Sequence, residues 1–291
     1  DYNLGIKNGV DVVQTVQDDG RYNHHAKGFE NEHIYKVDDK IAEKLKEFSK
    51  LLFKGTLRHS YPHSWRSKAP LIYRNTPQWF ISMEKNKLRD IALKSIDETV
   101  FYPPQGQTRL RSMIETRPDW CVSRQRVWGV PLPLFVSKET GQPLRDLEVV
   151  ERIADIYEEE GSDTWFTEDP QRFLGEKYKL EDYDQVKDVV EVWFDSGSTH
   201  AFCLEKREDL KWPASMYLEG SDQHRGWFHS SLLESSGTRG RAPYESVLTH
   251  GFVVDGKGRK MSKSLGNVIS PDDILKKYGV DILRLWVVAS D

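Results

Sequence analysis

Four cations lie close together in the stretch GKGRKMSKSLGN, which runs from residue 256 to residue 267. They are Lys257, Arg259, Lys260 and Lys263, and glycines and serines surround them. Backbone N–H groups in a glycine-containing turn can point at an anion, and lysine is a mobile point charge that suits phosphate. The stretch therefore permits a triphosphate clamp, although a cluster of like charges is also typical of an ordinary solvated loop.

The elements expected on either side place this loop at the end of a sheet. An apolar run over 247–254 predicts a strand before it, and Ser270 with Pro271 predicts the capped start of a helix that Gly279 ends. In open parallel sheets, ligands bind outside the carboxyl ends of the strands. Lys260 and Lys263, three residues apart, would share one face of a helical turn.

A pair of carboxylates follows another predicted strand, at 215–218, and opens a helix expected over 221–235. Glu219 and Asp222 in that position could accept both hydroxyls of a ribose, but such residues also form ordinary solvent-facing helix turns. The run Val189–Phe194 predicts a further strand, which we expect to lie parallel to 216–218 in the same sheet.

Composition limits the class of protein. The chain of 291 residues suffices for two or three packed units, and its net charge of −4 excludes wholesale electrostatic attraction to nucleic acid. The two cysteines, Cys121 and Cys203, are isolated, which fits a reducing compartment or buried thiols. No apolar run approaches the ~20 residues that span a bilayer. We expect a fragment of a longer cytoplasmic protein without a membrane partner, since the chain opens on Asp1 without an initiator methionine or a signal peptide.

Other elements follow from periodicity. Apolar spacings of three and four predict helices from about residue 38 to the glycine at 55, over 83–99 and over 146–161. Short β-like runs lie at 12–13 and 34–35.

The basic loop also carries a resemblance. Lys260-Met261-Ser262-Lys263-Ser264 is the complete KMSKS signature of class I aminoacyl-tRNA synthetases. The stretches RPDWCVSRQRVWGVPLP, VWFDSGSTH, YLEGSDQHRGWF and LTHGFVVDGKGRKMSKSLGN occur in the order and spacing of the isoleucyl-tRNA synthetases. The chain resembles this family, in its bacterial form, over essentially all its residues. Alternatives are the related valyl-tRNA synthetases, which diverge at 219–228, a synthetase-like nucleotide-binding protein without catalysis, and an unrelated nucleotide-binding or scaffold domain in which the motifs are coincidental.

The resemblance implies ATP-dependent activation of isoleucine to isoleucyl-adenylate, transfer to tRNA(Ile), and hydrolytic editing of mischarged valine. ATP with Mg²⁺, isoleucine and tRNA(Ile) would be the partners of a monomeric enzyme. The His-Ile-Gly-His half and the anticodon-binding domain of the family are absent from this sequence, so we expect the isolated chain to be inactive.

The resemblance also assigns roles to residues. Lys263 and Lys260 would be catalytic, and the nucleotide would contact them together with Met261, Ser262, Ser264, His250 and Gly251. Glu219, Gly220 and Asp222 would bind the adenylate, Gln223 would orient the substrate amino group, and Trp193 and Trp227 would wall the isoleucine pocket. Either tryptophan could equally be a core residue.

Three further assignments come from the resemblance. Arg124 and Arg126 would contact the tRNA acceptor end, against the alternative of a cationic surface turn. Asp1 would hold the amino group of a mischarged residue in an editing site. Many relatives have zinc-binding cysteines at the positions of Ser64 and Ser67, and because serine hydroxyls are poor zinc ligands, we expect no metal in this segment.

The expected fold is α/β: the second half of a class I synthetase Rossmann-like parallel sheet, with the end of a β-rich editing insertion and a smaller α+β connective insertion. We predict an editing remnant at 1–57, connective strands and a helix at 58–107, core at 108–128, a second connective insertion at 129–190, core with the KMSKS loop at 191–270, and the start of a helical region at 271–291. The parallel sheet itself is expected from 108–128 and 191–270.

Overall fold

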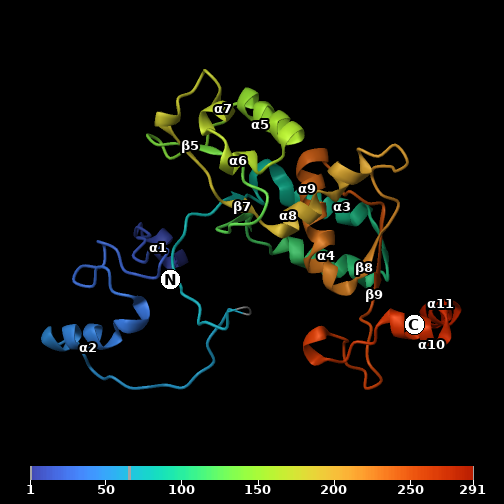
Figure 1. Ribbon diagram of the computed structural model, residues 1–291, viewed down its shortest axis with the longest axis horizontal. Helices are drawn as coiled ribbons and strands as arrows, with labels where there is room; N and C mark the ends of the chain where they lie inside the picture. Colours follow the sequence, from blue (N-terminus) through green and yellow to red (C-terminus); the bar gives the residue numbers. More distant parts are fainter. Residues whose placement is uncertain (1, 65–66, 291) are drawn as a thin grey trace. The chain divides into compact units, whose positions relative to one another are not determined.

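The computed structural model describes residues 2–64 and 67–290 of the chain, with side chains from residue 4 onward. The chain divides into two compact units, Asp1–Pro77 and Gln78–Asp291 (Figure 1). The second unit contains every predicted site residue except Asp1.

The first unit is built of turns and short helices. It contains α1 (Tyr2–Lys7), the 3-10 helix η1 (Ile34–Lys36) and α2 (Asp38–Glu47), with isolated bridges such as Val16 to Tyr22. The β-like runs predicted at 12–13 and 34–35 are wrong, because the first has no regular structure and the second lies in η1. The predicted helix at 38 ends at Glu47, short of Gly55, and its residues are not buried. The assignment of residues 1–57 to an editing domain stays a prediction.

The second unit contains a three-stranded parallel sheet in the order β2-β9-β8. Its strands are β2 (Val100–Tyr102), β9 (Ser246–His250) and β8 (Tyr217–Gly220). Phe101 and Tyr217 both pair with Val247, and Gly220 pairs with His250. The predicted α/β class with a parallel sheet is confirmed. The carboxyl ends of β8 and β9 lie side by side, which is where such sheets bind ligands.

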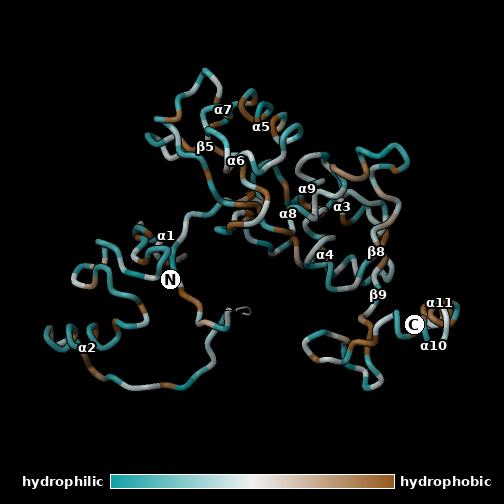
Figure 2. Tube along the Cα trace, viewed as in Figure 1, coloured by the Kyte–Doolittle hydropathy of each residue, from teal (hydrophilic) through white to brown (hydrophobic). Residues whose placement is uncertain are grey.

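Helices cover one face of this sheet. They are α3 (Leu88–Glu98), which follows the 3-10 helix η2 (Lys85–Lys87), α4 (Gln105–Glu115) and α9 (Trp227–Arg239). The core beneath them includes Phe101, Ile96, Leu110, Leu232 and Val247. In α9 the residues from Phe228 to Ser236 are all buried, because α3 and α8 (Val192–Gly197) also pack on it. On the opposite face Val100, Tyr102 and Leu218 are about half exposed, and Figure 2 shows hydrophobic residues along β8.

The run predicted as a strand over 189–194 divides at Glu191. Val189–Val190 forms β7, which pairs antiparallel with β4 (Ser123–Arg124), and α8 begins at Val192. The Glu191 carboxylate accepts a hydrogen bond from the Trp193 amide and so caps α8. The prediction that 189–194 lies parallel to 216–218 in one sheet is therefore wrong.

The predicted contribution of 108–128 to the parallel sheet is also wrong. That segment holds most of α4, then β3 (Trp120–Cys121), which pairs antiparallel with β1 (Phe80–Ile81), and β4. The third parallel strand comes instead from 100–102. The π-helix η4 (His200–Leu204) follows α8, and the 3-10 helix η5 (Ser221–Arg225) links β8 to α9.

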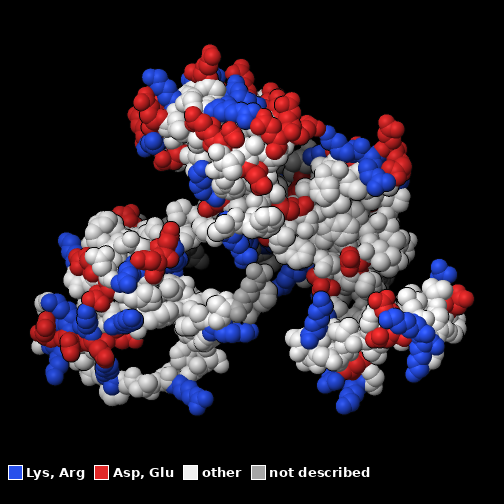
Figure 3. Space-filling view, viewed as in Figure 1, with Lys and Arg blue, Asp and Glu red and all other residues white. Residues whose placement is uncertain are grey.

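Residues 129–190 form a small α+β lobe with its own core. Its strands β5 (Phe135–Ser137) and β6 (Tyr183–Gln185) pair antiparallel, and its helices are α5 (Leu147–Glu160), α6 (Thr164–Thr167), α7 (Pro170–Leu174) and the 3-10 helix η3 (Leu180–Asp182). Phe135, Ile153 and Trp165 are buried in that core. The prediction of a helix over 146–161 is confirmed. Acidic side chains gather over α5 (Figure 3), a surface that would repel phosphate.

The chain ends in three helical segments: η6 (Lys263–Leu265), α10 (Pro271–Tyr278) and α11 (Val280–Ala289). Ser270 caps α10 by accepting from the Asp272 amide, and Gly279 follows its last residue, as predicted. None of the helices that the structure describes is long and apolar enough to cross a membrane.

Candidate active site

The ends of the parallel strands bring three predicted site residues together. Gly220 ends β8 opposite His250 of β9. A Cβ placed on Gly220 would lie 2.7 Å from Asp222 Oδ1 and 3.7 Å from His250 Cε1. Glu219 precedes them, and its Oε2 accepts a hydrogen bond from the Gly220 amide at 3.0 Å. Glycine at 220 is thus what leaves room for the Asp222 carboxylate beside the strand ends.

Gln223 links this group to the start of α9. Its Oε1 accepts a hydrogen bond from the Trp227 amide at 3.0 Å, and its Nε2 donates to Asp222 Oδ2 at 3.3 Å. A Cβ on Gly226 would lie 2.5 Å from Gln223 Oε1 and 2.9 Å from the Trp193 ring. Gln223 and Trp193 therefore converge on one glycine, next to the carboxylates.

The two tryptophans differ in environment. The Trp227 ring stacks on Tyr217, with centroids 4.0 Å apart and planes at 6°, and its Nε1 donates to Ser196 O at 3.0 Å. It packs against the main core, as the alternative interpretation of this residue requires. Trp193 is 40% exposed and available to a ligand. Their role as pocket walls stays a prediction.

The basic loop is a hairpin held by Asp255. The Asp255 carboxylate accepts hydrogen bonds from the Asn267 side chain and from the Arg259 and Lys257 amides, which together lower its pKa to about 2. Gly258 and Gly266, both with positive φ, make its turns. The Met261 amide donates to Val253 O, and the Ser262 hydroxyl accepts from the Leu265 amide and lies 3.2 Å from the Ser264 hydroxyl. These contacts determine the conformation of the loop, and none of them involves a lysine ammonium group.

The cations of the loop have different partners. Arg259 is ion-paired with Asp255, and Lys260 Nζ lies 3.5 Å from the centroid of the Phe252 ring. Lys260 forms a bridge with Val254, whereas Lys263 begins η6, so the predicted shared helical face is wrong. Lys263 is exposed and makes no ion pair with any residue that the structure describes. A lysine in this state can move to meet a phosphate.

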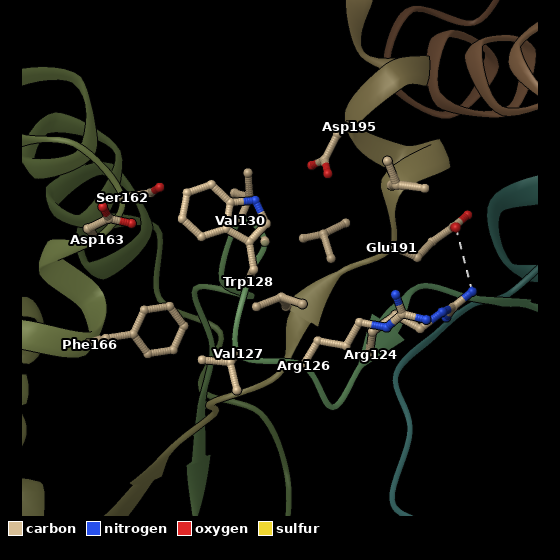
Figure 4. Close-up of a pocket in the computed structure, with 14 residues that line it drawn as sticks. Arg124, Arg126, Val127, Trp128, Val130, Ser162, Asp163, Phe166, Glu191 and Asp195 are labelled. Atoms are coloured by element: carbon tan, nitrogen blue, oxygen red, sulfur yellow. Dashed lines mark ion pairs between the residues drawn. The ribbon is translucent and has the colours of Figure 1, made fainter. Parts of the chain in front are cut away.

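A separate cavity of about 550 Å³ lies between the core and the α+β lobe (Figure 4). Charged, aromatic and small or aliphatic residues line it: Arg124, Arg126, Val127, Trp128, Gly129, Val130, Ser162, Asp163, Phe166, Val189, Val190, Glu191, Val192 and Asp195. The Trp128 side chain is 89% exposed and lies between the 162–166 segment and α8. The cavity combines two arginines and a large aromatic face, groups that can bind an unpaired nucleotide, with three carboxylates, those of Asp163, Glu191 and Asp195.

Glu191 contacts a residue of the cavity, Arg124, and a residue of the core, Trp120. Its Oε2 lies 3.5 Å from Arg124 Nη2 (Figure 4), and its Oε1 accepts a hydrogen bond from Trp120 Nε1 at 3.0 Å. Arg124 Nη1 also donates to Ser123 O at 2.7 Å. Burial, together with the charge of Glu191, raises the pKa of the nearby Asp195 carboxyl.

The sequence of the chain matches a known protein family over nearly its whole length. Residues 11–291 match the family described as tRNA synthetases class I (I, L, M and V). The chain belongs to the class I tRNA synthetases. This membership excludes the alternative of an unrelated domain with coincidental motifs.

Two curated relatives agree with the predicted resemblance. The chain is 69% identical to the isoleucine–tRNA ligase of Pelagibacter ubique (strain HTCC1062), covering 100% of this chain and 32% of that protein. It is 53% identical to the isoleucine–tRNA ligase of Gluconobacter oxydans (strain 621H), with the same coverage. A solved structure, Mycobacterium tuberculosis methionyl-tRNA synthetase in complex with methionyl-adenylate, matches at 19% identity over 80% of this chain and 37% of that chain, with a TM-score of 0.48. The chain spans about a third of the length of the curated relatives it matches.

Two expectations for this synthetase chain fall in its first unit. Asp1, the predicted editing residue, lies outside the described residues. The Ser64 hydroxyl accepts from the Ser67 amide at 3.2 Å, and the Ser67 hydroxyl accepts from the Ala69 amide at 3.3 Å. Among the residues that the structure describes, no group of three or more His, Cys, Asp or Glu could hold a metal ion. The absence of zinc stays a prediction.

Sequence reasoning missed Glu191, Trp128, Asp163 and Phe166 as residues of the synthetase cavity. A signal existed for the first two: Glu191 is the one acid in an otherwise apolar run, and Trp128 closely follows Arg124 and Arg126. Asp163 and Phe166 are brought to the cavity by the fold of the lobe, which no local pattern indicates.

Proposed function

We propose that this chain is part of an isoleucine–tRNA ligase, which activates isoleucine with ATP and transfers it to tRNA(Ile). The observation that carries the proposal is the meeting of Gly220, Asp222 and His250 at the ends of β8 and β9, in a chain that also contains an intact KMSKS loop. The high identity to isoleucine–tRNA ligases supports isoleucine as the substrate.

In the first step, an isoleucine carboxylate oxygen attacks the α-phosphorus of ATP, the bond to the β-phosphate oxygen breaks, and pyrophosphate leaves. Such phosphoryl chemistry depends mainly on positioning and charge neutralisation. Glu219 and Asp222 would hold the ribose hydroxyls, and Gln223 would orient the substrate amino group. A Cβ at Gly251 would meet no described atom within 4 Å, so the nucleotide could approach the backbone there.

Lys263 would neutralise the charge that develops on pyrophosphate, and Lys260 would assist it. The ammonium group of Lys263, which is exposed and has no ion-pair partner among the described residues, supports this assignment. Mg²⁺ would accompany ATP and reduce the charge repulsion among its phosphates. The residues of this chain do not form a cluster for it in the described part of the structure.

In the second step, a terminal ribose hydroxyl of tRNA attacks the adenylate carbonyl, and AMP leaves. The cavity beside α8 suits an unpaired nucleotide, with Arg124 and Arg126 toward phosphate and Trp128 toward a base. We also propose editing of mischarged valine with Asp1 as a contact, a monomeric state and a cytoplasmic location.

The test uses a protein of the relatives' full length that contains this chain. We expect isoleucine-dependent ATP–pyrophosphate exchange and charging of tRNA(Ile), with valine activated far more weakly. ATP binding without exchange would favour the non-catalytic alternative, and a preference for valine with tRNA(Val) would favour a valyl enzyme.

A further inference from the structure

Glu191 is a buried carboxylate to which the proposed reaction gives no role. Its side chain is 7% exposed. Burying a charge costs free energy unless the charge is paired and hydrogen-bonded, so the groups that contact Glu191 indicate its role. They come from three elements: Trp120 of β3, Arg124 of β4 and the Trp193 amide of α8.

Two of these partners are neutral donors. The Trp120 indole donates at 3.0 Å and the Trp193 amide at 3.3 Å, and the side-chain oxygen of a glutamine could accept either bond. Only arginine needs the negative charge. Arg117, whose guanidinium lies 5.5 Å from the Trp120 ring centroid, also feels it, because Glu191 partly offsets the lowering of the Arg117 pKa by burial.

Arg124 is the cation in closest contact, and it lines the cavity. Its Nη1 donates to the Ser123 and Cys121 carbonyl oxygens, at 2.7 and 3.2 Å, while Nη2 faces Glu191. Because Nη1 donates to two carbonyl oxygens and Nη2 lies beside the carboxylate, contacts at both nitrogens fix the orientation of the guanidinium plane. A planar donor group held in this way loses less freedom when it binds a phosphate.

We propose that Glu191 is a positioning residue, whose charge holds Arg124 in the orientation that binds the tRNA acceptor end. The inference rests on the proposed contact of Arg124 with tRNA. Glu191 touches no substrate itself, and it acts through Arg124.

The test is Glu191→Gln in the full-length enzyme, since this variant keeps one acceptor oxygen, which can serve the Trp120 indole, and removes the charge beside Arg124 together with the second acceptor that the Trp193 amide uses. We expect KM for tRNA in aminoacylation to rise about fivefold, while isoleucine-dependent ATP–pyrophosphate exchange stays within about twofold of wild type. Glu205→Gln, which removes the charge of a carboxylate that is ion-paired with Arg239 and does not line the cavity, is the matched control and should leave KM for tRNA unchanged. Circular dichroism checks that each variant folds.

A double-mutant cycle separates positioning from a merely structural role. Arg124→Ala should raise KM for tRNA at least as much as Glu191→Gln, and the double variant should be no worse than Arg124→Ala alone. If the two substitutions instead raised KM for tRNA by independent factors that multiply in the double variant, the inference would be overturned. A lower KM in Glu191→Gln would also overturn it, because Glu191 would then mask the arginine rather than position it.

A second readout does not depend on tRNA. If Arg124→Ala leaves KM for tRNA unchanged, the proposed tRNA contact is wrong, and the positioning role is judged from the rate at which phenylglyoxal modifies Arg124, followed by peptide mass spectrometry. A faster modification in Glu191→Gln than in wild type supports positioning, and an equal rate overturns it.

Discussion

The contact between α8 and α9 predicts a pair of glycine substitutions with opposite effects on stability. A Cβ on Gly197 would overlap Glu234 Oε1 and lie 2.9 Å from the Ser230 hydroxyl oxygen. Glu234 is only 9% exposed, so its carboxyl cannot swing into solvent without loosening the packing. Overpacking of this kind costs about 1–3 kcal/mol, so Gly197→Ala should reduce the free energy of unfolding by that amount.

Gly237, on the same helix as Glu234, is the matched control. Its Cβ would meet only Leu88 Cδ1 at 3.5 Å, which is ordinary van der Waals contact. Alanine is favoured over glycine in a helix interior, so Gly237→Ala should increase the free energy of unfolding by about 0.5–1 kcal/mol. The two variants should therefore differ by roughly 1.5–4 kcal/mol.

Urea denaturation of the chain, followed by tryptophan fluorescence, measures both variants. Eight of its nine tryptophans lie beyond residue 77 and report on the second unit. The midpoint should fall for Gly197→Ala and rise for Gly237→Ala, with similar slopes. If Gly197→Ala were as stable as wild type, the close approach of α8 to α9 would be wrong and the reasoning would fail.

Three other predictions concern activity and pH. In the full-length enzyme, Lys263→Ala should slow adenylate formation about 100-fold with little change in isoleucine affinity. Lys257→Ala should have little effect on either. If pre-steady-state assays gave equal, small effects for both variants, the loop would be an ordinary solvated cluster of charges. Burial, and then the charges of Asp195 and Glu191, raise the pKa of Glu234 to about 9. Since the folded state then holds a proton that the unfolded state has lost, stability should fall as pH rises from about 5 to 9, by at most about 1.4 kcal/mol per pH unit, and Glu234→Gln should flatten this dependence in urea titrations. A wild-type stability that does not change over that range would contradict the assignment. The isolated 291-residue chain should not catalyse isoleucine-dependent ATP–pyrophosphate exchange, and robust exchange would show that its own phosphate-binding groups suffice.

The sequence correctly predicted helices whose first and last residues are marked by local capping residues. Asp146 and Gly161 delimit α5, and Ser270 and Gly279 delimit α10, because caps act within one turn of the helix they end. Glu219 and Asp222 at the end of β8 were also proposed from a local pattern, a predicted strand followed at once by carboxylates, whereas His250 and Gly251 were assigned by the resemblance.

Pairing between distant segments was not predictable in the same way. The three residues of β2 carry no signal that distinguishes them from a loop, and they become a strand only because β9 lies alongside. The run 189–194 has the composition of a strand throughout, and it divides at Glu191 because tertiary partners from β3 and β4 fix that carboxylate. The cavity beside α8 likewise depends on how the lobe folds back on the core.

Helix α8 has six residues and contributes to two proposed sites. Val192 and Asp195 line the cavity, whereas Trp193 lies against Gly226 and the Ser196 carbonyl accepts the Trp227 indole. Because these four residues lie within two turns of one helix, we expect a substitution that shifts the helix at one side to shift it at the other. Under the proposed function, a substitution of Trp193 in the full-length enzyme should therefore be evaluated by two measurements, discrimination between amino acids in adenylate formation and efficiency of tRNA charging, because α8 contributes residues to both proposed sites.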